Sequence, residues 1–107
     1  MASYSATQAK HITLVASTVD DIRIDGEFNL LNIVNRDSTS PVYVRWGRGT
    51  TAAAVTDPTV AGDNTIVIPG SGSIAVDWPF EPVIGATTPV YIKVIGAGTG
   101  GVSVQGI

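Results

Sequence analysis

The segment VYVRW at residues 42–46 alternates apolar and polar side chains, so that Tyr43 and Arg45 share one face and the other three residues share the opposite face. The segment VYIKVI at residues 90–95 repeats this alternation. A period of two residues is typical of a β-strand that turns one face toward the core. Both segments are therefore predicted to be half-buried strands.

The choice of apolar residues extends this prediction to the whole chain. The sequence holds 14 Val, 11 Ile and 12 Thr but only 3 Leu among its 107 residues. Leu is ordinarily among the commonest residues of soluble domains. β-branched side chains lose rotamer freedom in a helix and pack well on a pleated sheet. The composition therefore predicts an all-β fold.

Further strand patterns, each bounded by Gly, Pro, Asn, Asp or Ser, fill most of the chain. About eight short strands predict a single-domain antiparallel β-sandwich with a jelly-roll-like or other Greek-key topology. Residues 1–10 are polar and without period, and we expect them to form a flexible N-terminal arm before a sandwich domain at residues 11–107. The further expected strands are 11–18, 19–25, 28–35, 65–69, 73–78 and 102–107, with 65–69 and 73–78 forming a hairpin.

The alternation also selects the expected core. Leu30 and Ile33 cannot both follow strict alternation, so one of them faces outward or a bulge intervenes. The residues expected to be most buried are Leu30, Ile33, Val44, Ile68, Val76, Ile92 and Val94.

The number and distribution of charged residues indicate which classes of partner the protein can bind. The net charge is −3, and the six basic residues are scattered, so no basic patch is available to neutralise phosphates and nucleic-acid binding is not expected. Charged residues make up 14% of the chain, about half the usual share. We expect part of the apolar surface to meet a protein partner, although Ser, Thr and Gly could instead cover it. No apolar run is long enough to span a membrane as a helix, so no membrane partner is expected.

Motifs that resemble chemical sites have simpler interpretations. Residues 96–101 match the G-x-G-x-x-G pattern, but six strand-like residues follow where a dinucleotide site needs a helix, so a glycine-rich hairpin turn is expected and no cofactor. The single histidine, His11, has no second histidine for a metal site. Asp20, Asp21, Asp25 and Glu27 are expected to form a solvated face. We expect no catalytic residue and no metal.

Aromatic residues supply the candidate interface. Trp46 and Trp78 each end a predicted strand, near Arg48 and Phe80, and Tyr4 lies in the predicted arm. Aromatic side chains in such places anchor protein interfaces or stack on sugars. The alternative is that both tryptophans close the two ends of the core.

Three stretches resemble a group of small bacteriophage virion proteins. These are LNIVNRDSTSPVYVRWG at 30–47, PTVAGDNTIVIPGSGS at 58–73 and VYIKVIGAGTGGVSVQGI at 90–107, and the resemblance covers roughly residues 12–107. The shared features are a strand that ends in V-N-R-D, a P-T-V-A-G-D-N loop, a V-I-P strand and a closing S-V-x-G strand. The chain departs from this pattern at residues 45–55, which lengthen the loop before Pro58.

The resemblance implies an all-β sandwich that coats or joins phage particles. It implies a capsid decoration protein that is made in the host cytoplasm, lies on the capsid surface of the virion and binds the major capsid protein. A homo-oligomer is expected, with a trimer by analogy with proteins on threefold positions. The alternative is a tail, collar or fibre-associated module that contacts host glycan through Trp46, Trp78 and the loop at 47–64. An enzyme is not expected.

Overall fold

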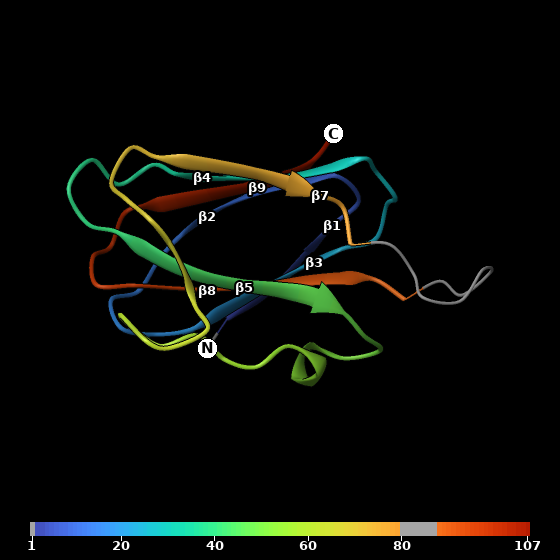
Figure 1. The fold of residues 1–107 in the computed structure, drawn as a ribbon, viewed down its shortest axis with the longest axis horizontal. Coiled ribbons are helices and arrows are strands. Elements are labelled where there is room, and N and C mark those ends of the chain that lie inside the picture. Colours follow the sequence, from blue (N-terminus) through green and yellow to red (C-terminus); the bar gives the residue numbers. More distant parts are fainter. Residues whose placement is uncertain (1, 80–87) are drawn as a thin grey trace.

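The computed structural model describes residues 2–79 and 88–107, and shows two β-sheets packed face to face (Figure 1). A short 3-10 helix, η1 (Ala52–Ala54), interrupts the longest loop. The all-β sandwich predicted from composition is therefore confirmed. The strands are β1 (Ser3–Ala6), β2 (Ala9–Thr13), β3 (Asp20–Ile24), β4 (Leu30–Asn35), β5 (Val42–Arg48), β6 (Ile66–Ile68), β7 (Ser73–Asp77), β8 (Val90–Gly96) and β9 (Gly101–Gly106).

The strand order is that of a jelly roll with one added strand. The five-stranded sheet has the order β1-β3-β8-β5-β6, and the four-stranded sheet has the order β2-β9-β4-β7. The antiparallel pairs β2–β9, β3–β8, β4–β7 and β5–β6 are nested within one another. Such nesting describes one long antiparallel hairpin wound into two sheets, which is the jelly-roll arrangement. β1 is the addition, and it pairs in parallel with the edge of β3.

The core lies between the sheets and is built from β-branched side chains. Five of the expected core residues, Ile33, Val44, Ile68, Ile92 and Val94, are fully buried. The prediction for Leu30 is wrong, because its side chain is 38% exposed while Leu31 is fully buried. The reason is that β4 alternates with Leu31 and Ile33 inward, which turns Leu30 outward. Val76, on the edge strand β7, is only half-buried.

The N-terminal residues belong to the sandwich, which corrects the expected arm at residues 1–10. β1 adds to the five-stranded sheet, and β2 begins at Ala9 and pairs with β9 in the other sheet. The segment is polar because both strands lie at sheet edges, where only alternate side chains face the core. Tyr4 is such an inward side chain and packs against the core.

The turn between β6 and β7 and the turn between β8 and β9 each connect one sheet to the other, whereas hairpin turns within one sheet were expected. β6 pairs with β5 in the five-stranded sheet, whereas β7 pairs with β4 in the other, so residues 65–69 and 73–78 do not form a hairpin. The turn between them carries Ser71 in the left-handed region, with φ 58°. The glycine-rich turn after β8 likewise leads to β9 in the opposite sheet. Turn residues signal a reversal of the chain but do not specify which sheet receives it.

Candidate binding surfaces

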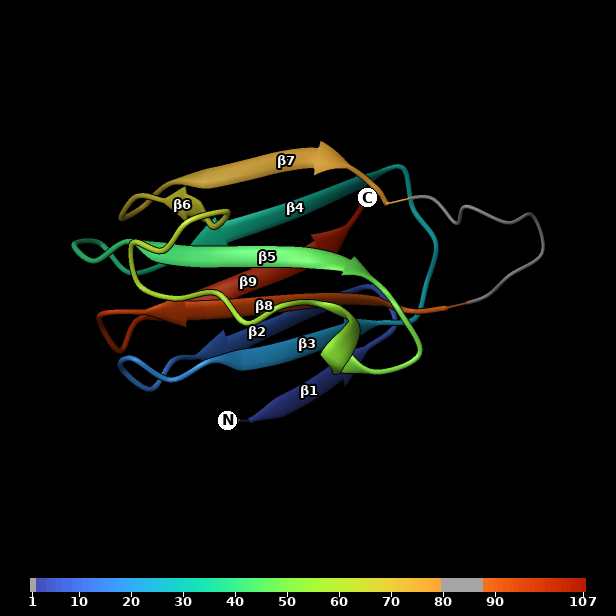
Figure 2. The same ribbon diagram turned by 60° about the horizontal axis from the view of Figure 1, so that its bottom comes forward.

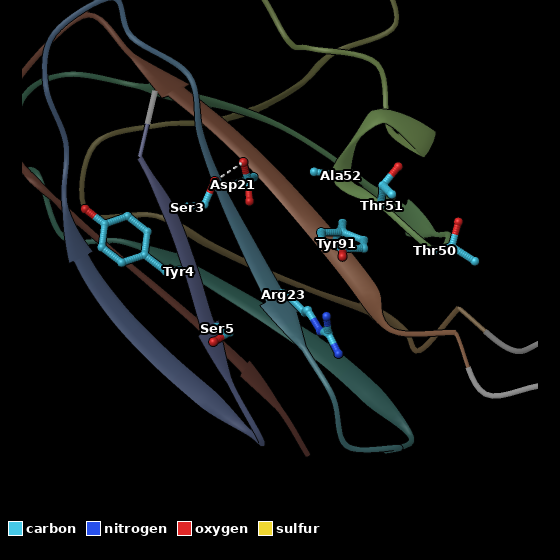
Figure 3. Close-up of a pocket in the computed structure, with 9 residues that line it drawn as sticks. All are labelled: Ser3, Tyr4, Ser5, Asp21, Arg23, Thr50, Thr51, Ala52 and Tyr91. Atoms are coloured by element: carbon cyan, nitrogen blue, oxygen red, sulfur yellow. Dashed lines mark hydrogen bonds between the residues drawn. The ribbon is translucent and has the colours of Figure 1, made fainter.

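A cleft of about 330 Å³ lies on the outer face of the five-stranded sheet. Asp21 and Arg23 of β3 reach this face because Ile22 and Ile24 between and beside them are buried in the core. On the side of the cleft away from β1 lie Thr50 and Thr51, from the loop before η1, and Ala52 of η1 itself (Figure 3). The lining residues are Ser3, Tyr4, Ser5, Asp21, Arg23, Thr50, Thr51, Ala52 and Tyr91.

The long loop at residues 49–65 forms one wall of this cleft because it folds over the sheet (Figure 2). Val55 is 5% exposed and Pro58 is also buried. Asp57 accepts a hydrogen bond from Lys93 Nζ at 2.5 Å, and the Lys93 side chain is 6% exposed. β8 is consequently buried on both faces over its whole length, which its alternating sequence did not predict.

Two polar side chains of the cleft have hydrogen-bond partners. Arg23 Nε donates to Asp25 Oδ1 at 2.6 Å, and this carboxylate, followed by the nearby Tyr91, raises the pKa of the Arg23 guanidinium. Ser3 Oγ donates to Asp21 Oδ2 at 2.9 Å. Exposed hydroxyls of Ser and Thr line both walls, so the cleft offers hydrogen bonds to a hydroxylated ligand.

Two members of the expected solvated acidic face are buried. Asp20 is 2% exposed and Asp21 is 4% exposed. β1 covers them: the Asp20 carboxylate accepts the main-chain N–H of Ala2 at 3.0 Å, and Ser3 holds Asp21. The expectation was wrong for these two residues because it left the N-terminal segment out of the sheet.

The structure separates the predicted aromatic interface residues. Trp78 is 1% exposed and meets Phe28 edge-on, with ring centroids 5.2 Å apart, so it closes the core. Tyr4 is half-buried beneath Lys10, whose Nζ lies 5.7 Å from the ring centroid. Trp46 is half-buried beside the core. Phe80 lies outside the described residues.

The Arg48 side chain joins separate segments of the chain. Its side chain is 7% exposed. The guanidinium donates to the main-chain carbonyls of Pro79 and Thr88 and to the carboxylate of Glu27. Arg48 thus binds three segments that are distant in the sequence, because its fork of donors reaches several acceptors at once.

The V-N-R-D motif ties the loops at the opposite end of the sandwich. Asn35 is 1% exposed, and its Nδ2 donates to the carbonyls of Ser40, Ile68 and Pro69 at 2.9, 3.2 and 3.1 Å. Arg36 Nη2 donates to the carbonyl of Ile12 at 3.2 Å. The motif on which the resemblance rests therefore carries structural hydrogen bonds.

The glycine-rich turn between β8 and β9 packs closely against the V-N-R-D motif. A β-carbon on Gly98 or Gly100 would meet Asp37, and one on Gly101 would meet the Arg36 guanidinium. The restriction is tightest at Gly100, where an added β-carbon would lie 2.3 Å from the Asp37 β-carbon, whereas at Gly101 the neighbouring atoms are the end of the flexible Arg36 side chain. The G-x-G-x-x-G spacing thus reflects contact between two loops.

The edge of the five-stranded sheet opposite β1 is apolar. β6 is an edge strand, and its Ile66 and Val67 side chains are 46% and 52% exposed. A second, smaller hollow of about 150 Å³ opens beside it, lined by Val44, Arg45, Trp46, Asn64 and Ile66. Exposed apolar side chains on an edge strand favour contact with another chain.

The described residues hold no group of three or more His, Cys, Asp or Glu side chains that could bind a metal ion. His11 is exposed on β2, and its Nδ1 lies 2.6 Å from Ser103 Oγ. Over residues 2–79 and 88–107, no helix has the length and apolar character needed to cross a membrane.

Comparison with known proteins found no matching family model, no similar curated protein and no similar solved structure.

Proposed function

We propose that this protein is a structural component of a bacteriophage virion, a decoration protein that binds the outer surface of the assembled capsid and stabilises the shell. The sequence resemblance over residues 12–107 suggests this role. The jelly-roll topology is compatible with it by analogy, because viral capsid domains and lectins both use this architecture.

The observation that carries the proposal is the apolar edge of the five-stranded sheet. Ile66 and Val67 expose about half of their side chains on a strand that has no neighbour on one side among the described strands. Such an edge suits contact with another protein. The partner proposed is the major capsid protein, and the protein is proposed to act as a homo-oligomer, with a trimer by analogy.

The proposed function can be tested by removing the protein from phage particles and adding it back. The protein is stripped from phage particles and added back, and the temperature of genome release is followed. A ligand that binds only the assembled shell stabilises it by mass action, so the release temperature should rise with added protein until the sites are filled. An unchanged release temperature at saturating protein contradicts the decoration role.

A second candidate, a tail, collar or fibre-associated module that contacts host glycan, is favoured by the cleft beside Arg23. Its hydroxyl-lined walls and the Arg23 side chain suit a polyhydroxylated ligand better than the buried Trp78 does. Copy number separates the two candidates. Hundreds of copies per particle support decoration, and a few to a few dozen support a tail or collar component.

A further inference from the structure

The cleft on the outer face of the five-stranded sheet has a hydrogen-bond acceptor and a hydrogen-bond donor on the same strand. Asp21 and Arg23 are two residues apart on β3, so their side chains share a face, about 6.5 Å apart along the strand. Ser3 Oγ donates to Asp21 Oδ2, whereas Asp21 Oδ1 accepts no hydrogen bond from the residues that the structure describes. Arg23 has five N–H donors, and its bond to Asp25 uses only Nε. Both side chains can therefore bind a further group.

Hydroxyl groups and an aromatic ring surround this pair. Ser5 of β1 and Tyr91 of β8 are the cross-strand neighbours of Arg23 on its two sides. Beyond Tyr91, the exposed side chains of Thr50 and Thr51 also line the cleft (Figure 3). Tyr91 is 7% exposed, so packing holds its ring in place. A ligand in the cleft thus meets one fixed aromatic ring and hydroxyl groups on opposite sides.

The charges around the cleft disfavour an ionic ligand. Asp25 already pairs with Arg23 at 2.6 Å, and Asp21 forms no ion pair within the described part of the chain. Lys93, the cross-strand neighbour of Asp21, is held by Asp57. An anion would therefore face two carboxylates, and an amine would face the Arg23 guanidinium. A hydroxyl group both donates and accepts, so it can bind Asp21 and Arg23 together.

The volume of the cleft limits the size of the ligand. Pockets for small ligands have volumes of about 300–1,000 Å³, and this cleft of about 330 Å³ lies at the lower end of that range. One sugar ring carries several hydroxyl groups and an apolar C–H face that can lie against an aromatic side chain. A single sugar therefore combines the required size, hydrogen-bonding pattern and apolar surface, whereas a longer oligosaccharide would extend out of the cleft.

We infer that this cleft binds a single uncharged sugar residue, with hydroxyl groups that accept from Arg23 and donate to Asp21 and with its ring against Tyr91. The inference rests on the second candidate function, contact with host glycan, and names the class of sugar and its site. Capsid decoration does not require it.

Titration of the full chain with monosaccharides tests this inference, and the amide signals of an NMR spectrum are the readout. The probes are the neutral methyl glycosides of glucose, galactose and mannose, together with the corresponding uronates and 2-amino sugars. We expect at least one neutral glycoside to bind with a millimolar Kd and to shift the amide signals of Arg23, Thr50 and Tyr91. The corresponding uronate and amino sugar should bind more weakly by at least about fivefold, because each places a charge beside a like charge.

Variants of the full chain locate the site and test the role of charge. Arg23→Met removes the donors and should weaken binding of the neutral sugar by at least about fivefold. Asp25→Asn removes the charge that balances Arg23 and should strengthen uronate binding. Thr50→Ala removes one hydroxyl group from the lining and should weaken binding, whereas Thr56→Ala, exposed on the same loop outside the cleft, is the matched control and should bind like the unaltered protein. Equal thermal unfolding temperatures show that all variants are folded.

The outcomes separate this inference from the function on which it rests. If a uronate or an amino sugar binds most tightly, glycan contact stands and the uncharged class is overturned. If the shifted signals lie outside the cleft, or Arg23→Met binds equally well, the site is overturned. If no monosaccharide binds, the inference is overturned, and binding of the protein to intact host cells then shows whether the second candidate function survives without it.

Discussion

The side chain of Asp37 packs directly against Gly100, so closely that a β-carbon on this glycine would overlap it. The two residues lie in loops that are distant in the sequence and join different strand pairs. Asp37 Oδ1 also accepts the main-chain N–H groups of Thr39 and Ser40, each at 3.0 Å. The Asp37 side chain therefore holds its own loop by hydrogen bonds and also packs against the glycine-rich turn. In this way the V-N-R-D motif and the glycine-rich turn are in direct contact.

Substitution of Gly100 should test this contact. Gly100→Ala is expected to lower the free energy of unfolding by about 1–3 kcal/mol, because the added methyl group forces the two loops apart. Thr99→Ala, at an exposed position of the same loop, should change it by less than about 0.5 kcal/mol. Chemical denaturation measures both. Equal midpoints for the two variants would show that the loops separate without cost.

The ionisation of Asp37 should appear in the pH dependence of stability. Hydrogen bonds from the main chain of Thr39, then of Ser40, lower the pKa of the folded carboxyl below its ordinary value of 3.8. Because the folded pKa lies below the unfolded one, the contribution is complete above pH 3.8 and is lost as the pH falls through the folded value. The stability difference between the unaltered protein and Asp37→Asn should therefore be constant from pH 7 to 5 and shrink below 3.8. Denaturation series at each pH measure it, and a difference that grows on acidification contradicts the assignment.

The buried amide of Asn35 should be important for stability. Asn35→Ala leaves three carbonyls without this donor, and we expect a loss of about 2–4 kcal/mol in the free energy of unfolding. Asn32→Ala, half-buried on the same strand, is the matched control and should cost less than about 1 kcal/mol. Urea denaturation with coincident fluorescence and circular dichroism measures both. A similar loss in the two variants would mean that the three carbonyls are satisfied in another way.

Adjacent leucines provide a sharp test of the facing of β4. Leu31 is fully buried and Leu30 is 38% exposed. Leu31→Ala should therefore cost about 2–5 kcal/mol, the range for truncation of a buried leucine, and Leu30→Ala less than about 1 kcal/mol. Thermal or chemical unfolding distinguishes them. The reverse order would place the strand one residue out of register.

The Lys93–Asp57 pair should hold the long loop against the sheet. Asp57→Ala leaves the buried ammonium of Lys93 without this partner, and we expect a loss of about 1–3 kcal/mol, less than for a fully buried pair because the Asp57 side chain is 53% exposed. Adding Lys93→Met to Asp57→Ala should restore most of the stability, since no charge then remains buried. A double variant as unstable as the single one would show that loop contacts other than the ion pair dominate.

The fold class and most of the strands could be predicted from the residues alone. Its Val, Ile and Thr content and the two-residue period of residues 42–46 report local backbone preference and the burial of one face, which are properties of single strands. For the same reason the inward faces of β3 and of the first half of β5 could be predicted. The polar arm could not be recognised as β1 and part of β2, because an edge strand needs few apolar residues.

The way in which the strands combine, and the surroundings of the candidate residues, depend on contacts between distant parts of the chain. The assignment of β6 and β7 to different sheets depends on the nested pairing of the whole chain, which no local turn signal contains. Trp78 and Arg48 looked alike as candidate interface residues, yet one closes the core and the other binds Pro79, Thr88 and Glu27. The cleft beside Arg23 is assembled from loops and strands distant in sequence. Such surfaces arise from packing between elements, and pattern along one strand carries no information about its neighbours.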